Sequence, residues 1–208
     1  MNIVVTGGLG FIGSAFVRYA SNQGAHCTVI DSMTYAADQS RLNGYNYDLI
    51  LKDICEDVSW ACKDAHYVVN FAAESHVDNS IKDGKPFIKS NVEGTYNMLE
   101  IARQIPTLKR FVQISTDEVY GDVEGNKPSH EFDRLEPSSY YSATKAAAEM
   151  LVMAAGRTYG LPHIITRTCN NFGVEQHKEK FLPTIFESIK NDVPIPIYGD
   201  GEQVREWM

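Results

Sequence analysis

Short apolar runs alternate with longer amphipathic stretches over most of the chain. Six of the runs are rich in β-branched or aromatic residues and end in polar or small residues, a pattern that predicts strands. They are NIVVT at 2–6, HCTVID at 26–31, YDLIL at 47–51, HYVVNFAA at 66–73, RFVQIS at 110–115 and PHIITRT at 162–168. Their nearly continuous apolar character is typical of parallel strands that are covered on both faces.

The stretches between these runs contain three helix candidates, at about 11–23, 91–104 and 139–159. The last is followed by Gly160 and Pro162, two residue types that end helices. Strands that alternate with helices build right-handed βαβ units. The sequence therefore predicts an α/β fold with a Rossmann-type, doubly wound parallel sheet and helices on both of its faces.

The pattern changes at about residue 170. NNFGVEQHKEKF has the composition of a loop, LPTIFESIKNDV that of a helix, and PIPIYGDGEQVREWM contains two prolines and two glycines. We expect a Rossmann domain over residues 1–169 and the start of a second lobe, outside the sheet, over residues 170–208.

The segment VVTGGLGFIG places Gly7, Gly10 and Gly13 directly after the first strand and at the start of the first helix. Glycines at this spacing allow a tight turn, a close approach of a pyrophosphate and close packing of helix on strand. The helix N-terminus offers N–H groups to the phosphates. The alternative interpretation is a tight turn that binds no ligand.

Acidic and small residues at the ends of the next strands favour a dinucleotide over that alternative. Asp31 falls 18 residues after Gly13, where a carboxylate accepts hydrogen bonds from the adenosine ribose and repels a 2′-phosphate, so NAD is favoured over NADP. Asp53 ends the third strand, where it can bond the adenine amino group. The small residues Ala72 and Ala73 follow the fourth strand, where the cofactor backbone would pass.

Tyr141 and Lys145 are four residues apart and share one face of the predicted helix at 139–159. An ammonium beside a phenol is expected to lower the pKa of the tyrosine, which could then take a hydroxyl proton while hydride leaves the same carbon. The alternative is an amphipathic surface pair. With IST at the end of the preceding strand, the set matches the short-chain dehydrogenase/reductase arrangement.

Thr116, Asp117 and Glu118 follow the fifth apolar run directly. Two carboxyl groups in a partly desolvated pocket repel each other, so the pKa of one is raised and the pair divides into an acid and a base. The alternative is an acidic N-cap or turn after the strand.

Five segments resemble the nucleotide-sugar 4,6-dehydratases of the extended short-chain superfamily, which act on dTDP-glucose or, in rhamnose synthesis, on UDP-glucose. The segments are TGGLGFIGS, FAAESHVDNSI, ISTDEVYGD, YSATKAAAE and NNFGVEQHKEKFLP, and the resemblance covers essentially all 208 residues. TDE is the most specific element, because sugar 4-epimerases carry a small or hydroxyl residue in place of the acid pair.

The resemblance implies a mechanism. Tyr141 deprotonates the 4-hydroxyl as hydride passes to a tightly bound NAD, and Thr116 holds the 4-oxygen. Glu118 then removes the carbon 5 proton, Asp117 protonates the departing 6-hydroxyl, and the hydride returns to carbon 6, so that NAD is regenerated in each turnover.

The resemblance also implies further contacts and a homodimer built through a four-helix bundle of the helices at 91–104 and 139–159. The additional cofactor-binding residues are Phe11, Ile12, Ser32, Thr34, Ile54, Phe71, Ser90 and Asn171. The substrate-binding residues are Ser75, Thr116, Asn170, Glu179, Lys180, Phe181, Pro196, Tyr198 and Arg205.

Three departures from the family pattern stand out. Tyr140 replaces a proline, Phe172 stands where tyrosine is common, and the chain ends at REWM where the family continues for about a third of its usual length. We therefore expect an incomplete substrate lobe, with either a longer gene product or a truncation as its explanation.

Composition excludes several other classes. Hydrophobic residues make up 43% and charged residues 22%, the proportions of an ordinary globular protein. A net charge of −8 argues against a nucleic-acid or anionic-membrane partner. The N-terminus MNIVVTGG has the pattern of a strand and not that of a signal peptide, and no apolar run approaches the roughly 18 residues of a membrane span. The four cysteines lack CxxC spacing, so we expect no metal site, no disulfide and a cytoplasmic location.

Two alternatives to the dehydratase stay open. One is a UDP-sugar 4-epimerase or decarboxylase of the same superfamily, and the other is a catalytically silent NAD-binding module. The sequence does not decide between dTDP and UDP, although YSATKAAAEMLVMAAGRTYGLP lies nearer the UDP-glucose dehydratases.

Overall fold

The computed structural model describes residues 1–123, 127–197, 199–202 and 204–208. The chain divides into two compact units, Met1–Thr168 and Cys169–Met208. This division falls one residue before the one expected from the sequence. The two units are described separately below.

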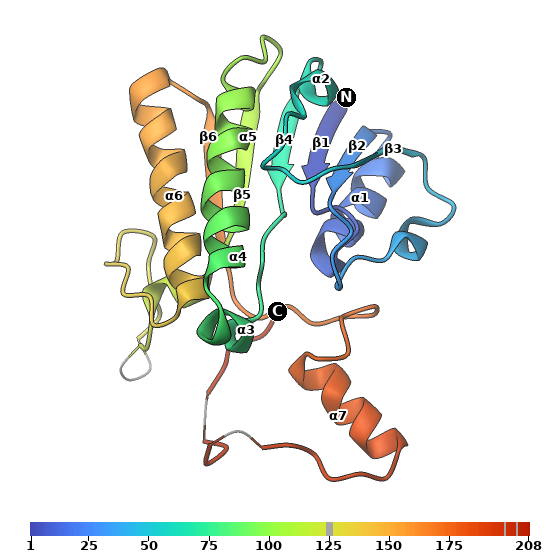
Figure 1. Ribbon diagram of the computed structural model, residues 1–208, viewed down its shortest axis with the longest axis vertical. Coiled ribbons are helices and arrows are strands. Elements are labelled where there is room, and N and C mark those ends of the chain that lie inside the picture. Colours follow the sequence, from blue (N-terminus) through green and yellow to red (C-terminus); the bar gives the residue numbers. More distant parts are fainter. Residues whose placement is uncertain (124–126, 198, 203) are drawn as a thin grey trace. The chain divides into compact units, whose positions relative to one another are not determined.

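The first unit contains a six-stranded parallel sheet (Figure 1). Its strands lie in the spatial order β3-β2-β1-β4-β5-β6, so the direction of winding reverses between β1 and β4. In such sheets, ligands bind outside the carboxyl ends of the strands at the point of reversal. The strands are β1 (Asn2–Thr6), β2 (His26–Asp31), β3 (Tyr47–Leu51), β4 (Tyr67–Asn70), β5 (Arg110–Thr116) and β6 (His163–Thr168).

All six predicted strands are present, but β4 is shorter than expected. It ends at Asn70, and residues 71–73 form a loop. The N–H of Ala72 donates to the hydroxyl of Thr6, at 3.2 Å, instead of to a strand carbonyl. A side chain of the neighbouring strand therefore ends the ladder at this position.

The helices agree with the prediction except in the second one. The segment expected to be a single helix at 91–104 is a π-helix, η2 (Ile88–Gly94), followed by α5 (Thr95–Ala102). The long helix, α6 (Tyr140–Tyr159), begins with a capping box at Ser139 and ends at Gly160 in the left-handed conformation. The other helices of this unit are α1 (Phe11–Asn22), η1 (Gln39–Leu42), α2 (Ser59–Cys62), α3 (Val77–Lys82), α4 (Lys85–Phe87) and η3 (Asp117–Tyr120).

Two hydrophobic clusters form on the two faces of the sheet, because successive strand side chains point to opposite faces. Val4 belongs to a cluster that includes residues of α2, α5 and α6, whereas Val5 belongs to one that includes residues of α1 and η1. Helices α5 and α6 lie side by side on their face (Figure 1). The predicted doubly wound sheet with helices on both faces is confirmed.

The second unit contains one helix in its described part, α7 (Phe181–Lys190), which matches the helix expected from LPTIFESIKNDV. An isolated bridge joins Asn170 to Trp207, and the N–H of Met208 donates to the carbonyl of Asn170 at 2.9 Å. The rings of Phe181 and Trp207 lie 5.9 Å apart. These contacts connect the start of the unit to its end.

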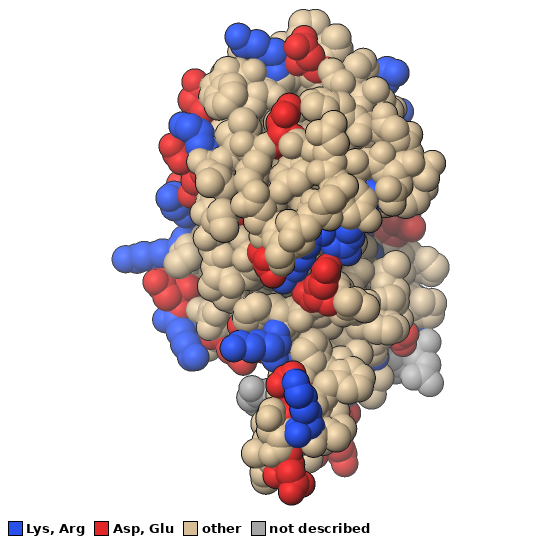
Figure 2. Space-filling model, turned by 90° about the vertical axis from the view of Figure 1, so that its right-hand side faces the viewer, with Lys and Arg blue, Asp and Glu red and all other residues tan. Residues whose placement is uncertain are grey.

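Charge is mixed on the face of the molecule shown in Figure 2, where basic and acidic residues are interspersed among uncharged ones. Among the described residues, no helix combines the length and the apolarity that crossing a bilayer requires. Within the same residues, no group of three or more His, Cys, Asp or Glu side chains is placed to hold a metal ion.

Candidate active site

The glycine-rich loop lies between β1 and α1 and is closed tightly. Gly7 has φ +65°, and a Cβ there would lie 2.7 Å from the backbone nitrogen of Ala72. The N–H of Gly10 donates to the carbonyl of Gly7, and a Cβ at Gly13 would collide with that same carbonyl. Gly10 is the N-cap of α1 and has no side chain to accept from the first N–H groups of the helix. The loop thus has the shape of a phosphate cradle.

Asp31 ends β2 next to this loop and is only 7% exposed. One carboxylate oxygen accepts from the N–H of Leu9 and the other from the N–H of Met33, both at 2.9 Å. Each oxygen retains a second lone pair, so both can still accept from a ribose hydroxyl. Ser32 and Thr34 lie exposed in the segment that follows.

Arg41, which the sequence did not indicate, holds the same loop from its other side. Its Nη1 donates to the carbonyl of Leu9 at 2.7 Å and to that of Ala36 at 2.8 Å, and the side chain is buried. Asp31 and Arg41 therefore fix both backbone groups of Leu9. The sequence signal is weak, because an arginine ten residues after a strand has the appearance of a surface residue.

The predicted adenine-side residues Asp53 and Ile54 follow β3. Burial alone would raise the pKa of Asp53, but hydrogen bonds from the N–H of Cys55 and from Lys89 outweigh it and lower that pKa. Ile54 is buried, and its side chain meets the place where a Cβ of Gly94 would lie. The Asp53 carboxylate is thus charged and half-buried, as an acceptor for an amino group requires.

A buried polar network joins the carboxyl ends of β1 and β4 to the middle of β5. The hydroxyl of Thr6 donates to the side-chain oxygen of Asn70 at 2.5 Å. The amide nitrogen of Asn70 donates to Gln113 at 2.9 Å and to Thr95 at 3.2 Å. All four side chains are at most 1% exposed. The network fixes the strand ends from which Phe71, Ala72 and Ala73 continue, and its sequence signal was a polar residue inside each apolar run.

The π-helix η2 carries the predicted cofactor residue Ser90 and, next to it, Asn91, which the sequence analysis missed. The side chain of Asn91 accepts from the N–H of Glu74 and donates to its carbonyl, at 2.9 and 3.0 Å. It also donates to the hydroxyl of Thr144 on α6 at 3.0 Å. Asn91 therefore attaches the loop that carries Ser75 to the helix that carries Tyr141. Local π-helical turns are frequent at functional sites for such reasons.

Thr116 ends β5 and is the N-cap of η3, the short helix formed by the acid pair. Its hydroxyl accepts from the N–H of Glu118 at 3.2 Å and donates to a carboxylate oxygen of Asp117 at 3.1 Å. The alternative interpretation of TDE as an acidic first turn is thus correct for the backbone. It does not account for the tyrosine on the neighbouring helix α6, whose pKa both carboxyl groups raise.

Tyr141, in the first turn of α6, is that tyrosine. Burial and then Glu118 raise its pKa, a hydrogen bond with Thr116 lowers it, and Asp117 raises it further, to about 12 in all. The expectation that Lys145 lowers this pKa is therefore wrong. Lys145 is instead held by the carbonyl of Ile114, and burial lowers its own pKa to about 8 although Glu149 opposes the shift. Thr116, Asp117, Glu118 and Tyr141 are brought together as predicted, with Lys145 one turn away.

The predicted substrate residues of the second unit, and the predicted cofactor residue Asn171, have contacts of their own. Asn170 donates to the carbonyl of Glu206 at 3.1 Å, and Asn171 donates to that of Cys169 at 2.9 Å. Lys180 is the N-cap of α7, and Glu179 lies 3.5 Å from His177. Pro196 and Arg205 are exposed, and Tyr198 lies outside the described residues. Their roles toward substrate stay predictions.

Comparison with known proteins matches this combination of loop, acid pair and Tyr-x-x-x-Lys helix to one family. The sequence pattern of the NAD dependent epimerase/dehydratase family matches residues 3–208. The chain belongs to this family. Within it, the chain is 46% identical over 215 residues to the low-salt glycan biosynthesis protein Agl12 of Haloferax volcanii and 45% identical over 226 residues to a dTDP-glucose 4,6-dehydratase of Haemophilus influenzae.

Both relatives of this epimerase/dehydratase family are longer than the chain. The alignments cover all of the chain but 69% and 67% of the relatives. Among solved structures, DesIV, a dTDP-glucose 4,6-dehydratase from Streptomyces venezuelae with NAD bound, matches with a TM-score of 0.94 at 39% identity, over all of the chain and 67% of DesIV. The predicted Rossmann-type fold and the predicted resemblance to the dehydratases are confirmed.

Proposed function

We propose that this protein catalyses the NAD-dependent 4,6-dehydration of an NDP-glucose to the NDP-4-keto-6-deoxyglucose, a hydro-lyase reaction. The observation that carries the proposal is the packing of η3, which carries Asp117 and Glu118, against α6, which carries Tyr141, at the carboxyl end of β5. Oxidation of an alcohol needs a base such as the tyrosine and a hydride acceptor, but no second pair of acid and base. The added acid pair suits a second chemical step on the same sugar.

The residues around the glycine loop fit NAD. The loop leaves room for a pyrophosphate, Asp31 offers lone pairs to the ribose, and Asp53 offers a charged acceptor to the adenine. When bound, NAD supplies a hydride acceptor and later donor, so that no net oxidation of the sugar results. Lys145 and Ser90 are the proposed contacts nearer the reacting end.

For the oxidation step, Tyr141 is the proposed base that takes the proton of the 4-hydroxyl. Burial raises the pKa of this phenol most, and Glu118 and Asp117 raise it further, to about 12, so the phenol is protonated at neutral pH and both carboxyl groups oppose the phenolate. A proton on one of these groups removes part of that opposition. The tyrosine is therefore more reactive when the acid pair holds one proton, which is also the state that elimination requires.

For the elimination step, Glu118 is the proposed base at carbon 5 and Asp117 the proposed acid at carbon 6. The 4-keto group makes the carbon 5 proton acidic, Glu118 takes that proton, and Asp117 gives its own proton to the departing hydroxyl. One water leaves, which gives a carbon 5–carbon 6 double bond. Glu118 then returns its proton to carbon 5 as carbon 6 gains a hydride, which bound NAD would supply. The Thr116 hydroxyl, already hydrogen-bonded at both Asp117 and Glu118, orients the pair.

The proposed substrate is dTDP-glucose, because the curated relatives that are named as dehydratases are named for it. The resemblance of the α6 segment to UDP-glucose dehydratases is the argument for UDP-glucose. In either case the product is a precursor of deoxysugars such as rhamnose.

A 4-epimerase is the second candidate, and one observation favours it. Asp117 and Glu118 form the first turn of η3 under the Thr116 cap, as a merely structural acidic turn would. Epimerisation needs the oxidation step but no proton transfer at carbon 5.

Assembly and location complete the proposal. Apolar side chains of α5 and α6 are exposed, among them Tyr96 at 56%, Met150 at 46% and Met153 at 38%. Packing of these helices against those of a second copy would bury them in a four-helix homodimer. All four cysteines are free thiols, which supports a reducing, cytoplasmic environment.

Incubation with dTDP-glucose and, separately, with UDP-glucose tests the function. We expect a product that has lost one water by mass and that absorbs strongly in alkali as a 4-keto sugar, with faster turnover of dTDP-glucose. An epimerised sugar of unchanged mass would favour the second candidate, and recovery of both substrates unchanged would contradict both.

A further inference from the structure

Arg167 lies one residue before the end of β6, where its neighbour across the sheet is Ser115 of β5. The next residue of β5 is Thr116, so the arginine stands beside the strand end that leads into the acid pair. Its side chain is only 14% exposed. A buried arginine requires partners for its N–H groups, and these partners connect two parts of the site.

The first partner is Glu149 of α6. Nε lies 3.0 and 3.1 Å from the two carboxylate oxygens, and Nη2 lies 2.7 Å from one of them. Glu149 is fully buried, and it is four residues after Lys145, one turn further along the same helix face. The arginine therefore attaches β6 to the helix that carries Tyr141 and Lys145.

The second partner is Tyr120, the last residue of η3. Nη1 of Arg167 donates to the tyrosine hydroxyl at 2.7 Å, and the guanidinium lies 4.9 Å from the ring centroid, a cation–π contact. Nη1 also donates to the carbonyl of Glu131 at 3.0 Å. η3 is closed by Gly121 at φ +74°, where a Cβ would collide with the carbonyl of Glu136. The arginine thus attaches β6 to the short helix that carries Asp117 and Glu118.

We infer that Arg167 is a positioning residue, which fixes the acid pair of η3 relative to Tyr141 on α6 through Tyr120 and Glu149. The inference depends on the proposed function only for the chemistry assigned to the two groups. Helix α6 is anchored in the hydrophobic core by Val152 and Ala155, whereas η3 is a single turn. Loss of Arg167 should therefore displace η3 more than α6, and elimination more than oxidation.

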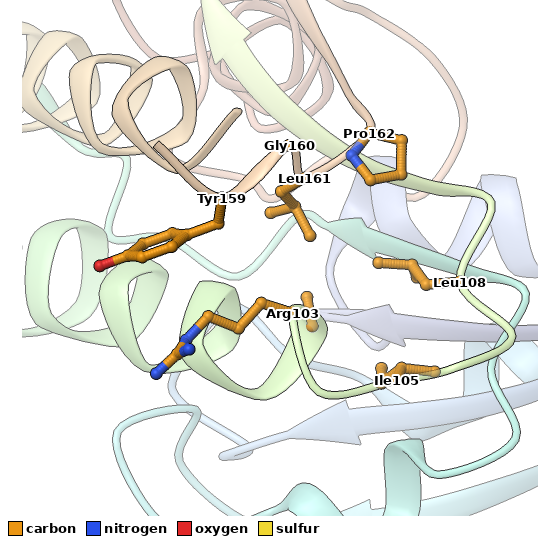
Figure 3. Close-up of a pocket in the computed structure, with 8 residues that line it drawn as sticks. Arg103, Ile105, Leu108, Tyr159, Gly160, Leu161 and Pro162 are labelled. Carbon is orange, nitrogen blue, oxygen red and sulfur yellow. The ribbon is translucent and has the colours of Figure 1, made fainter. Parts of the chain in front are cut away.

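The chain provides a matched control in Arg103, which lies near the amino ends of β5 and β6. Arg103 bonds Glu100 through Nε and Nη2, at 2.9 and 2.6 Å, and its guanidinium lies 5.1 Å from the ring centroid of Tyr159. Figure 3 shows Arg103 and Tyr159 at a pocket lined also by Ile105, Leu108, Leu161 and Pro162, in the segments that lead into β5 and β6. Arg103 and Arg167 make contacts of the same kind, but the predicted catalytic residues lie at the carboxyl ends of the strands, where Arg167 is.

The test compares Arg167→Lys with Arg103→Lys in single-turnover reactions with dTDP-glucose. For Arg167→Lys we expect reduced cofactor to form within threefold of the native rate and to accumulate, because water loss from carbons 5 and 6 is at least tenfold slower. Tyr120→Phe keeps the ring and loses only the hydroxyl. Its elimination rate should therefore fall between that of the native protein and that of Arg167→Lys. Arg103→Lys should match the native protein in both steps.

Amide hydrogen exchange gives a readout that needs no turnover. In Arg167→Lys, the N–H groups of Glu118 and Gly121, which bond within η3, should exchange at least tenfold faster, while those of α6 change little. Equal slowing of both chemical steps, with faster exchange throughout α6, would show a general structural role and overturn the inference, as would native behaviour in all assays. If the native protein does not dehydrate the sugar, the proposed function fails and the exchange pattern alone decides the position of η3.

Discussion

Arg103, near the amino ends of β5 and β6, and Arg167, near the carboxyl end of β6, make the same kinds of contact but differ in burial. Arg103 and Arg167 each bond a glutamate through Nε and Nη2 and each lie over a tyrosine ring. The side chains of Arg103 and Glu100 are 40% and 28% exposed, whereas those of Arg167 and Glu149 are 14% and 0% exposed. Water and salt screen the attraction between Arg103 and Glu100, but they screen that between Arg167 and Glu149 much less.

The buried pair has a consequence that the exposed pair lacks. Glu149 has no access to water, so its charge depends on Arg167 for compensation, and the loss of either partner leaves an unpaired charge in the interior. The same charge acts on Lys145, whose pKa Glu149 raises against the effect of burial. The same geometry is thus a surface contact between Arg103 and Glu100, whereas between Arg167 and Glu149 it affects the charge balance of the candidate active site.

The largest expected effect is on stability. Arg167→Met leaves the carboxylate of Glu149 buried and unpaired, which should destabilise the fold by about 3–5 kcal/mol. The midpoint of urea unfolding measures the change. Arg103→Met, the matched exposed variant, should leave the midpoint nearly unchanged. The double variant Arg167→Met with Glu149→Met should recover most of the lost stability. Equal midpoint shifts for Arg167→Met and Arg103→Met would contradict the distinction between the buried and the exposed pair.

The acid pair gives the next largest effect, in rate. Asp117→Asn should slow elimination by about a hundredfold or more, the usual contribution of one positioned general acid, and still reduce the bound cofactor transiently. Glu118→Gln should also oxidise carbon 4 but lose exchange of the carbon 5 proton with deuterated solvent, and Tyr141→Phe should do neither. Absorbance of reduced cofactor and mass analysis of the recovered sugar report these steps. Native elimination rates in both carboxamide variants would leave the pair as a structural turn.

Asp31 is a third carboxylate to compare with Glu100 and Glu149. It is buried at the carboxyl end of β2 and accepts from backbone N–H groups instead of from an arginine. Its charge is uncompensated by a cation among the contacts described, so a 2′-phosphate should be repelled. We expect NAD to bind at least about tenfold more tightly than NADP, a difference of about 1.4 kcal/mol. Calorimetric titration measures both affinities. Asp31→Asn should reduce the ratio, and a native ratio of one would contradict the assignment.

A further expected effect is on the pH dependence of stability. Burial lowers the pKa of Lys145 from 10.5 to about 8, so the folded state disfavours the charged lysine, and stability should rise as pH increases from about 8 to 10.5. Glu149→Gln removes the charge that opposes this shift, so the rise should begin at lower pH, whereas Glu100→Gln should leave it in place. Unfolding midpoints across this range measure the effect, and Lys145→Met, which lacks the titrating group, should abolish the rise.

Most of the fold was predictable because strands of a covered parallel sheet are apolar over their whole length. The end of β4 was not, since the Thr6 hydroxyl that captures Ala72 lies 66 residues away in the sequence. The π-helix over 88–94 was missed for a local reason. Over so short a stretch, the apolar spacing of a π-helical turn differs little from that of an α-helix.

The site was predictable where spacing carries the chemistry, as in the glycine loop, TDE and Tyr-x-x-x-Lys. It was not predictable where partners meet only through strand register. Glu149 and Arg167 are 18 residues apart and Tyr120 is 47 residues from Arg167, so no local pattern links them. The pKa of Tyr141 was predicted in the wrong direction, because helix spacing places Lys145 near the phenol but says nothing of the Ile114 carbonyl that holds it.

The polar network of Thr6, Asn70, Thr95 and Gln113 also has a consequence for the order in which the chain folds. Its hydrogen bonds span three strands, so pairing of β1 with β4 before β5 arrives leaves the amide of Asn70 without Gln113. An unsatisfied buried amide costs about 1–3 kcal/mol, which penalises partly assembled sheets and sheets with a slipped strand. The central strands should therefore form together late in folding. Asn70→Val should let β1 and β4 pair earlier, visible as a populated refolding intermediate that the native chain lacks.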